Sequence, residues 1–71
     1  MEFDVYGRIR VRVVESRGPW RTAYAVRSNG RLHRLDDVVV PADATVEDIV
    51  AILEAVFHEA GEPGAEIRRV R

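Results

Sequence analysis

The segment from Thr45 to Gly61, TVEDIVAILEAVFHEAG, constrains the fold more than any other part of the sequence. Its apolar residues recur at the i, i+3, i+4 and i+7 spacing of a helix with one buried face. That face comprises Val46, Ile49, Val50, Leu53, Val56, Phe57 and Ala60, with Ile52 on its flank, and the polar side comprises Glu47, Ala51, Glu54, Ala55 and His58. A helix with a single apolar side packs on another element, so the rest of the chain must supply a layer for it to cover.

Both ends of this helix carry sequence signals. Thr45 stands at the N-cap with Asp48 three residues later, which predicts a capping box with Asp in place of the preferred Glu or Gln. Glu47 and Asp48 place negative charge in the first turn, where the helix dipole favours it. Gly61 is the expected C′ residue, and Pro63 prevents the helix from continuing.

The residues before the helix have the pattern of β-strands. From Phe3 to Val13, apolar residues occupy odd positions and mostly charged residues occupy even ones, which predicts one strand with a buried and a wet face. Gly7 interrupts this pattern and is expected to mark a bulge or a close backbone approach. A second strand is expected from residue 20 to 28. One of its faces would carry Trp20, Thr22, Tyr24 and Val26.

A hairpin is expected to follow. Asn29-Gly30 predicts a type I′ turn, after which residues 31 to 35 return as a third strand. If Ser28 pairs with Arg31, Val26 faces His33, but the pattern does not settle this register.

The stretch from residue 35 to Pro41 has two interpretations. Val38 to Val40 favours a strand and Pro41 ends it. Either the third strand runs on to Val40 with a kink at Asp36-Asp37, or a separate short strand begins at Val38.

A final strand is expected from Ala65 to Arg71, with Ile67 and Val70 as its apolar residues. The predicted order is therefore β-β-β-α-β. A helix on one face of a mostly antiparallel sheet makes a two-layer α+β fold. A chain of 71 residues forms one domain, residues 1–71.

The small size of the chain bears on its oligomeric state. A core of this size supplies only about 3–5 kcal/mol of stability. The sequence contains no cysteine, so neither a disulfide nor a thiolate metal site adds to it. We therefore expect a homodimer.

Composition argues against a general nucleic-acid binder and against a membrane protein. The sequence contains 11 arginines, no lysine and 12 acidic residues, so the net charge is −1, which is not typical of a nucleic-acid binder. The use of Arg without Lys, together with abundant Ala and Val, indicates a GC-rich bacterial genome. No apolar run approaches the roughly 20 residues of a membrane span. The N-terminal sequence MEFDV is not that of a signal peptide, so we expect a cytoplasmic protein.

Arg8, Arg10 and Arg12 occupy alternate positions of the first predicted strand and would form a row on one face. Such a row can grip phosphates or an acidic partner. The alternative, which the net charge favours, is a solvated outer face whose arginines pair with acidic residues such as Glu15 or Glu66.

The predicted hairpin would extend this patch with further arginines. Trp20 and Tyr24 could then stack on bases, although a core position is the better interpretation in a chain with so few aromatic residues. The candidate partner-binding residues are therefore Arg8, Arg10, Arg12, Arg27 and Arg31, with Arg34 as a further member of the patch.

The sequence contains no recognisable catalytic or metal-binding motif. His58-Glu59 does not continue as HExxH, and the glycines form neither GxGxxG nor a P-loop. His33, Asp36 and Asp37 could form a metal site only if the fold supplied another ligand. Adjacent carboxylates in a strand point to opposite faces, so Asp36 and Asp37 would not bind the same ion. We therefore expect no enzymatic activity, no cofactor and no metal.

Four short motifs support a family resemblance. FDVYGR at residues 3–8, the lone Trp20, LDDVVVP at 35–41 and FHE at 57–59 resemble a family of very small bacterial proteins of unknown function. The resemblance covers most of the chain and implies a bacterial source, but no activity, cofactor or site.

Two weaker resemblances concern local structure. Val38 to Pro63 is similar to the strand, cap, helix and turn of ubiquitin-like β-grasp proteins, but too few residues follow for their later strands and no Gly-Gly ends the chain. The order of elements is also similar to that of small HicB-type antitoxins, whose characteristic motif is absent.

These observations favour a protein-interaction or regulatory module without catalytic activity. It would bind a protein partner, or a second copy of itself, through the uncovered sheet face or an exposed edge strand. The alternative is an antitoxin-like nucleic-acid-binding protein that uses the arginine row.

Overall fold

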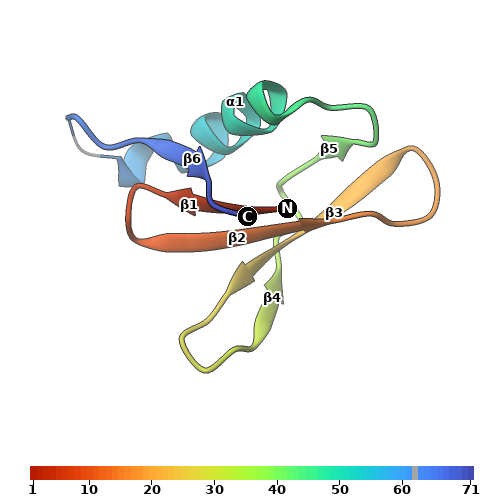
Figure 1. Ribbon diagram of the computed structural model, residues 1–71, viewed down its shortest axis with the longest axis horizontal. Coiled ribbons are helices and arrows are strands. Elements are labelled where there is room, and N and C mark those ends of the chain that lie inside the picture. Colours follow the sequence, from red (N-terminus) through yellow and green to blue (C-terminus); the bar gives the residue numbers. More distant parts are fainter. Residues whose placement is uncertain (62) are drawn as a thin grey trace.

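The computed structural model describes residues 1–61 and 63–71 and consists of two layers (Figure 1). One layer is a sheet in the order β4-β3-β2-β1-β6, and the other is the helix α1. The elements are β1 (Glu2–Val5), β2 (Ile9–Val14), β3 (Trp20–Val26), β4 (Leu32–Arg34), β5 (Val40–Pro41), α1 (Val46–Phe57), the 3₁₀ helix η1 (His58–Ala60) and β6 (Ile67–Arg69). All strand pairs are antiparallel, and β5 pairs with β3. The predicted two-layer α+β class is confirmed, with more strands than expected.

The first predicted strand is in fact a hairpin of β1 and β2. Tyr6 and Gly7 both have positive φ, 57° and 71°, and turn the chain back on itself. The hairpin is symmetric about Gly7, because Phe3 lies opposite Val11 and Val5 lies opposite Ile9. Paired residues therefore have numbers of equal parity, so all odd residues share one face, as they would in a single strand. This symmetry is why the alternation predicted the faces correctly and the topology wrongly.

The core lies between α1 and the odd-numbered side of the sheet. Its buried residues are Phe3, Val5, Val11, Val13, Ala23, Val38, Val40, Ile49, Leu53 and Ile67. The predicted faces of α1 are correct, since Ile49 and Leu53 are fully buried and the predicted polar side is exposed. The predicted final strand is shorter than expected, and Val70 is exposed.

The predicted capping box is present at the start of α1. The backbone N–H of Asp48 donates to Thr45 Oγ1 at 3.1 Å, and the N–H of Thr45 donates to Asp48 Oδ2 at 3.0 Å. At the other end α1 passes into η1, and the N–H of Gly61 donates to the carbonyl of His58 at 3.3 Å. The backbone of Gly61 is extended, with φ −78° and ψ 147°, so the C′ role predicted for it does not explain the glycine.

The ring of Tyr6 explains why residue 61 is glycine. A Cβ at Gly61 would lie 3.0 Å from Cζ of Tyr6, closer than side chains normally pack. We expect Gly61→Ala to lower the free energy of unfolding by about 1 kcal/mol, because the ring must move. Urea unfolding measures this, and the same substitution in a Tyr6→Ala background is the control. An equal loss in both backgrounds would exclude the ring contact as the cause.

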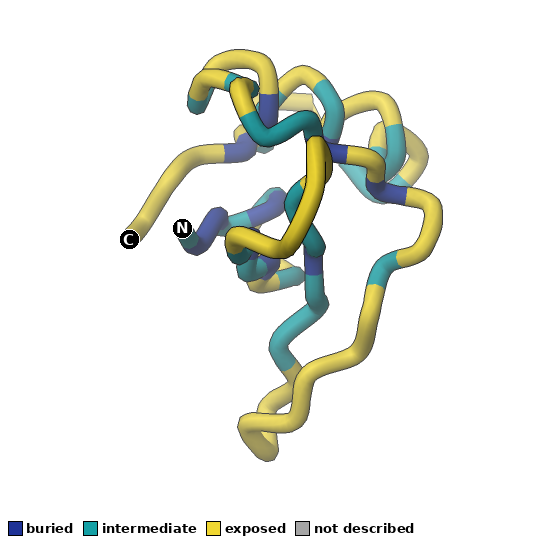
Figure 2. Tube along the Cα trace, turned by 90° about the vertical axis from the view of Figure 1, so that its right-hand side faces the viewer, coloured by how far each residue is buried: buried dark blue, intermediate teal, exposed yellow. Residues whose placement is uncertain are grey.

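The second hairpin differs from its prediction in turn type, and the structure settles the register that the pattern left open. The loop comprises three residues, 28–30, with only Gly30 at positive φ, and Asn29 Oδ1 accepts a hydrogen bond from the Arg31 N–H at 3.0 Å. Val26 therefore lies opposite Leu32 rather than His33. In Figure 2 the tip of this hairpin projects from the body and is exposed.

The chain from β4 to β5 runs along the same edge of β3, with a break between the two strands. Leu35 still donates to the carbonyl of Ala23 at 2.9 Å, the chain turns at Asp36-Asp37, and Val40 then lies opposite Arg21. Of the two interpretations, the separate short strand is nearer to the structure, but this strand begins at Val40 instead of Val38 and includes Pro41.

Candidate functional site

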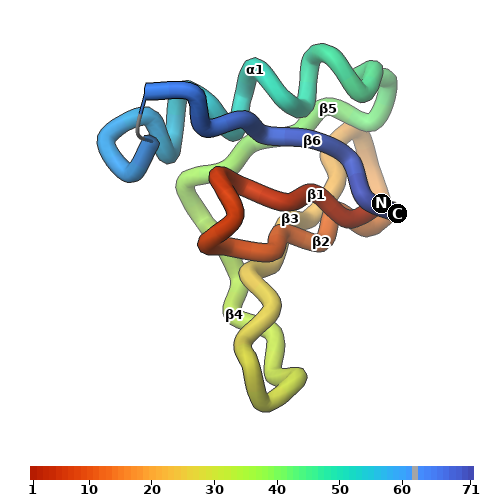
Figure 3. Tube along the Cα trace, turned by 60° about the vertical axis from the view of Figure 1, so that its left-hand side comes forward, coloured from red at the N-terminus to blue at the C-terminus, as the bar shows by residue number. Residues whose placement is uncertain are grey.

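The sheet face opposite α1, called the open face below, carries the even-numbered residues of β1, β2 and β3. In Figures 1 and 3, α1 lies on one side of β1 and β2, and no described helix lies on the other. The strand register places these residues in two rows across the sheet. The first row is Glu2, Arg12, Tyr24 and Arg34, and the second is Arg68, Asp4, Arg10, Val26 and Leu32.

A carboxylate on the open face holds two of the candidate arginines. Glu2 Oε1 accepts hydrogen bonds from Arg12 at 2.9 Å from Nε and 2.7 Å from Nη2, and Arg10 Nη1 lies 3.5 Å from Oε2. The Glu2 side chain is only 10% exposed. The hydrogen bond from Arg12 is the largest influence on the pKa of Glu2. Together with the charge of Arg12, the hydrogen bond from Arg10 and the charge of Arg71, it holds this pKa below its usual value, although burial opposes this.

The expectation that the arginines pair with carboxylates is therefore correct, but the partner differs. Arg10 and Arg12 pair with Glu2, while Glu15 pairs with Arg21 at 3.1 Å. Sequence inspection missed Glu2 because the hairpin, which was not predicted, brings β1 beside β2.

The five candidate arginines do not form one row. Arg8 lies in the turn between β1 and β2, because the predicted strand breaks at residues 6 and 7. Arg27 and Arg31 flank the loop of the second hairpin and are exposed. Only Arg10 and Arg12 lie on the open face, where the register adds two others, Arg34 and Arg68.

Charge is strongly segregated along the chain. All 11 arginines fall within residues 8–34 and 68–71. Residues 35–67 contain no arginine or lysine and nine acidic residues: Asp36, Asp37, Asp43, Glu47, Asp48, Glu54, Glu59, Glu62 and Glu66. Three of these, Glu47, Asp48 and Glu54, are exposed on α1. The helix side is therefore acidic and the strands carry the arginines, an asymmetry that the net charge of −1 conceals but a charge count by segment reveals.

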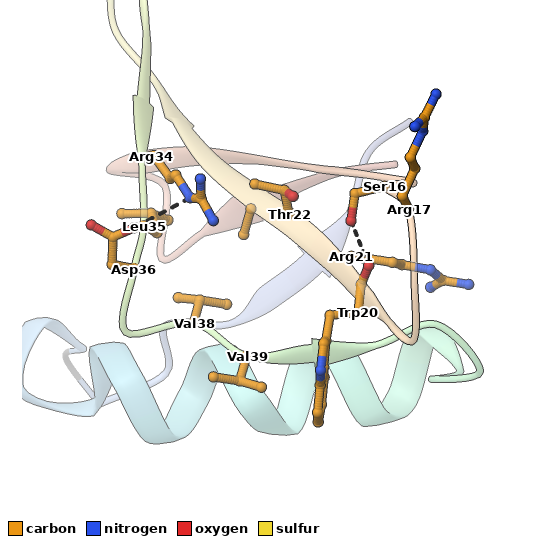
Figure 4. A pocket seen from close by; sticks show the side chains of 11 residues that line it. Ser16, Arg17, Trp20, Arg21, Thr22, Arg34, Leu35, Asp36, Val38 and Val39 are labelled. Carbon is orange, nitrogen blue, oxygen red and sulfur yellow. Dashed lines mark hydrogen bonds and ion pairs between the residues drawn. The ribbon is translucent and has the colours of Figure 1, made fainter.

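A groove of about 500 Å³ lies beside β3 where the chain leaves it between β4 and β5 (Figure 4). Its rim carries Trp20 and Val39, which are 51% and 56% exposed, and the buried Val38 also lines it. Arg17 and Arg34 also line it. We call this feature the Trp20 groove.

The core position expected for Trp20 and Tyr24 is wrong. Both belong to the even-numbered face of β3, whereas the odd-numbered Ala23 points into the core. Trp20 is held by its backbone, since Ser16 Oγ donates a hydrogen bond to its carbonyl. Small alanines occupy the core-facing side of β3, so the aromatic side chains of this strand remain on the other side.

The structure also bears on metal binding and membrane insertion. Within residues 1–61 and 63–71, no group of three or more His, Asp or Glu side chains is arranged to hold a metal ion. His33 lies on the exposed β4, and His58 follows α1, where its Nδ1 is 3.3 Å from the carbonyl oxygen of Ala55. No helix in the described part of the chain has both the length and the apolar character needed to cross a membrane.

Comparison with known proteins identifies one family. A family model described as "Domain of unknown function (DUF7661)" matches residues 1–71. No curated protein and no solved structure matches the chain. The match confirms the resemblance to a family of unknown function, and it assigns neither a source organism nor an activity.

Proposed function

We propose that this chain, which belongs to the family described as Domain of unknown function (DUF7661), is a protein-interaction module that binds an acidic partner protein through its open face. The observation that carries this proposal is the segregation of charge between the helix side and the strands. A surface that gathers arginines is complementary to a carboxylate-rich partner and speeds the encounter with it. The module acts by binding and has no catalytic activity.

The mixture of charges on the open face favours a protein over a nucleic acid. Glu2 and Asp4 lie between the arginines of β2 and the strand β6. Carboxylates at these positions repel a phosphate backbone, whereas a protein partner can place charges of either sign opposite them. Nucleic-acid binding therefore remains the second candidate, favoured only by Arg10, Arg12 and the adjacent Tyr24.

Self-association is part of the proposal. The outer edge of β4 is exposed in the described structure and offers a strand edge to a second copy. We expect a dimer at micromolar concentration in analytical ultracentrifugation. A stable monomer would contradict the proposed self-association but would not bear on the proposed binding of a partner protein. A bacterial source and a cytoplasmic location stay predictions from the sequence.

Two double variants with the same net charge test the open face. Arg10→Gln with Arg68→Gln removes two arginines from the open face. Arg31→Gln with Arg69→Gln removes two exposed arginines elsewhere, since Arg69 lies opposite the core residue Phe3. Circular dichroism verifies that both fold.

The probes are fluorescein-labelled Glu-rich peptides, together with single-stranded and duplex DNA, followed by anisotropy at low and physiological salt. We expect the open-face variant to bind the peptide about fivefold more weakly and the control to differ little, because each exposed pair contributes only a fraction of a kcal/mol. Equal losses in both variants would contradict the assignment to this face. Binding of DNA alone, weakening steeply with salt, would replace the proposal with nucleic-acid binding.

A further inference from the structure

The Trp20 groove exists because β3 loses its neighbour over a short stretch. The Leu35 N–H donates a hydrogen bond to the carbonyl of Ala23, and Val40 lies opposite Arg21. Between these two points, residues 36–39 do not pair with β3. Val38 donates instead to the carbonyl of Leu35 at 3.2 Å, which closes the departing segment into its own turn. The edge of β3 near Thr22 is therefore left open over a cavity of about 500 Å³.

The rim of the groove exposes two large apolar side chains next to each other. Trp20, the chain's only tryptophan, is 51% exposed and Val39 is 56% exposed. Figure 4 shows both side chains at the same end of the groove, with Val38 beside them. Exposed tryptophans at the edge of a preformed hollow are the residues that most often anchor a protein partner.

The charged residues of the groove are available to a ligand. Arg17 has no ion-pair partner in the described structure. Arg34 Nε lies 3.2 Å from Asp36 Oδ1, but both side chains are more than two-thirds exposed, so this pair is weak and can exchange for a ligand carboxylate. Arg21 is already engaged, by Glu15 at 3.1 Å and by the carbonyl of Ala44 at 3.2 Å.

We propose that the Trp20 groove takes one aliphatic side chain from an extended acidic segment of the partner protein, while an adjacent carboxylate of that segment pairs with Arg17 or Arg34. The inference rests on the proposed function and names the partner's chemistry. The aliphatic walls formed by Leu35, Val38 and Val39 match a leucine or valine side chain better than a planar base. Guanidinium groups can bind a carboxylate in the two-pronged manner that fixes its orientation.

The fluorescence of Trp20 reports on the groove, because no other tryptophan contributes. The probes are two Glu-rich peptides that differ at one central position, Leu in the first and Ser in the second. We expect the Leu peptide to shift Trp20 emission to shorter wavelength, to protect it from acrylamide quenching, and to bind about tenfold more tightly than the Ser peptide, because it buries a leucine side chain.

Matched variants separate the groove from the open face. Arg17→Gln and Val39→Ser should each lower the affinity for the Leu peptide. Arg27→Gln, which alters an exposed hairpin residue outside both the groove and the open face, should not. If both peptides bind equally without changing Trp20 emission, and binding still depends on Arg10 and Arg68, the groove inference is wrong and the open-face function stands. If DNA changes Trp20 emission and the peptides do not bind, both proposals are overturned in favour of base stacking.

Discussion

Replacing Leu53 with alanine is expected to leave much of the chain unfolded at room temperature. Leu53 is fully buried and is one of only two residues of α1 that are, the other being Ile49. Truncating a buried leucine costs about 2–5 kcal/mol, through lost burial and the cavity left behind. A single core of this size supplies only about 3–5 kcal/mol in total. The substitution therefore removes most of the margin that keeps the helix on the sheet.

Leu32→Ala is the matched control for this prediction. The chemistry of the change is identical, but Leu32 lies on the projecting hairpin and is 45% exposed. We expect it to alter stability by less than about 0.5 kcal/mol. Urea unfolding followed by circular dichroism compares the two variants. A Leu53→Ala protein as stable as the Leu32→Ala protein would mean that α1 does not depend on this contact.

Replacing Glu2 with glutamine is expected to destabilise the protein by about 1.5–2 kcal/mol at neutral pH. The carboxylate receives hydrogen bonds from Arg12 and Arg10 beneath the open face, and glutamine keeps the shape but loses the charge. This expected loss of stability lies at the low end of the range for charged hydrogen bonds. The reason is that the Arg12 side chain is 39% exposed, so water can replace the hydrogen bond that it loses. Glu54→Gln is the control, since Glu54 is an exposed carboxylate without an ion pair in the described structure.

The effect of Glu2 should depend on pH in a definite direction. The guanidinium groups lower the pKa of Glu2 in the folded protein below its ordinary value of 4.5. Its contribution to stability is therefore fully present above pH 4.5 and is lost as the pH falls through the lowered pKa. Urea titrations at neutral and acidic pH should show the wild type and Glu2→Gln converging at low pH. A constant difference across this range would show that the charge of Glu2 is not responsible.

The two hairpins show how far local patterns can predict topology. Alternation assigned the paired residues of β1 and β2 to their correct faces, yet a hairpin symmetric about Gly7 has the same alternation as one strand. In the second hairpin, Asn29-Gly30 marked the turn correctly, but only Gly30 has positive φ, and the register that the pattern left open places Val26 opposite Leu32. Pairing between strands depends on contacts that a period-two pattern does not encode.

The candidate site was predicted only in part for the same reason. Arg10 and Arg12 share a face because they are two residues apart in one strand, and this spacing can be read from the sequence. Glu2, Arg34 and Arg68 join them only through pairing with β1, β4 and β6. Trp20 was assigned to the core from its amino-acid type, whereas the side of β3 on which it lies decides its exposure.

The sequence alone determined the helix, its cap and its two faces, as well as the buried and wet sides of the first strands. These features follow from the spacing of neighbouring residues, and tertiary contacts did not change them. Tertiary structure decided which strands lie side by side, which carboxylate holds the arginines, and where the groove opens. Those outcomes depend on the turns at Gly7 and Asp36-Asp37 and on the packing of segments that are distant in the sequence. The spacing of neighbouring residues does not encode the free energies of these contacts.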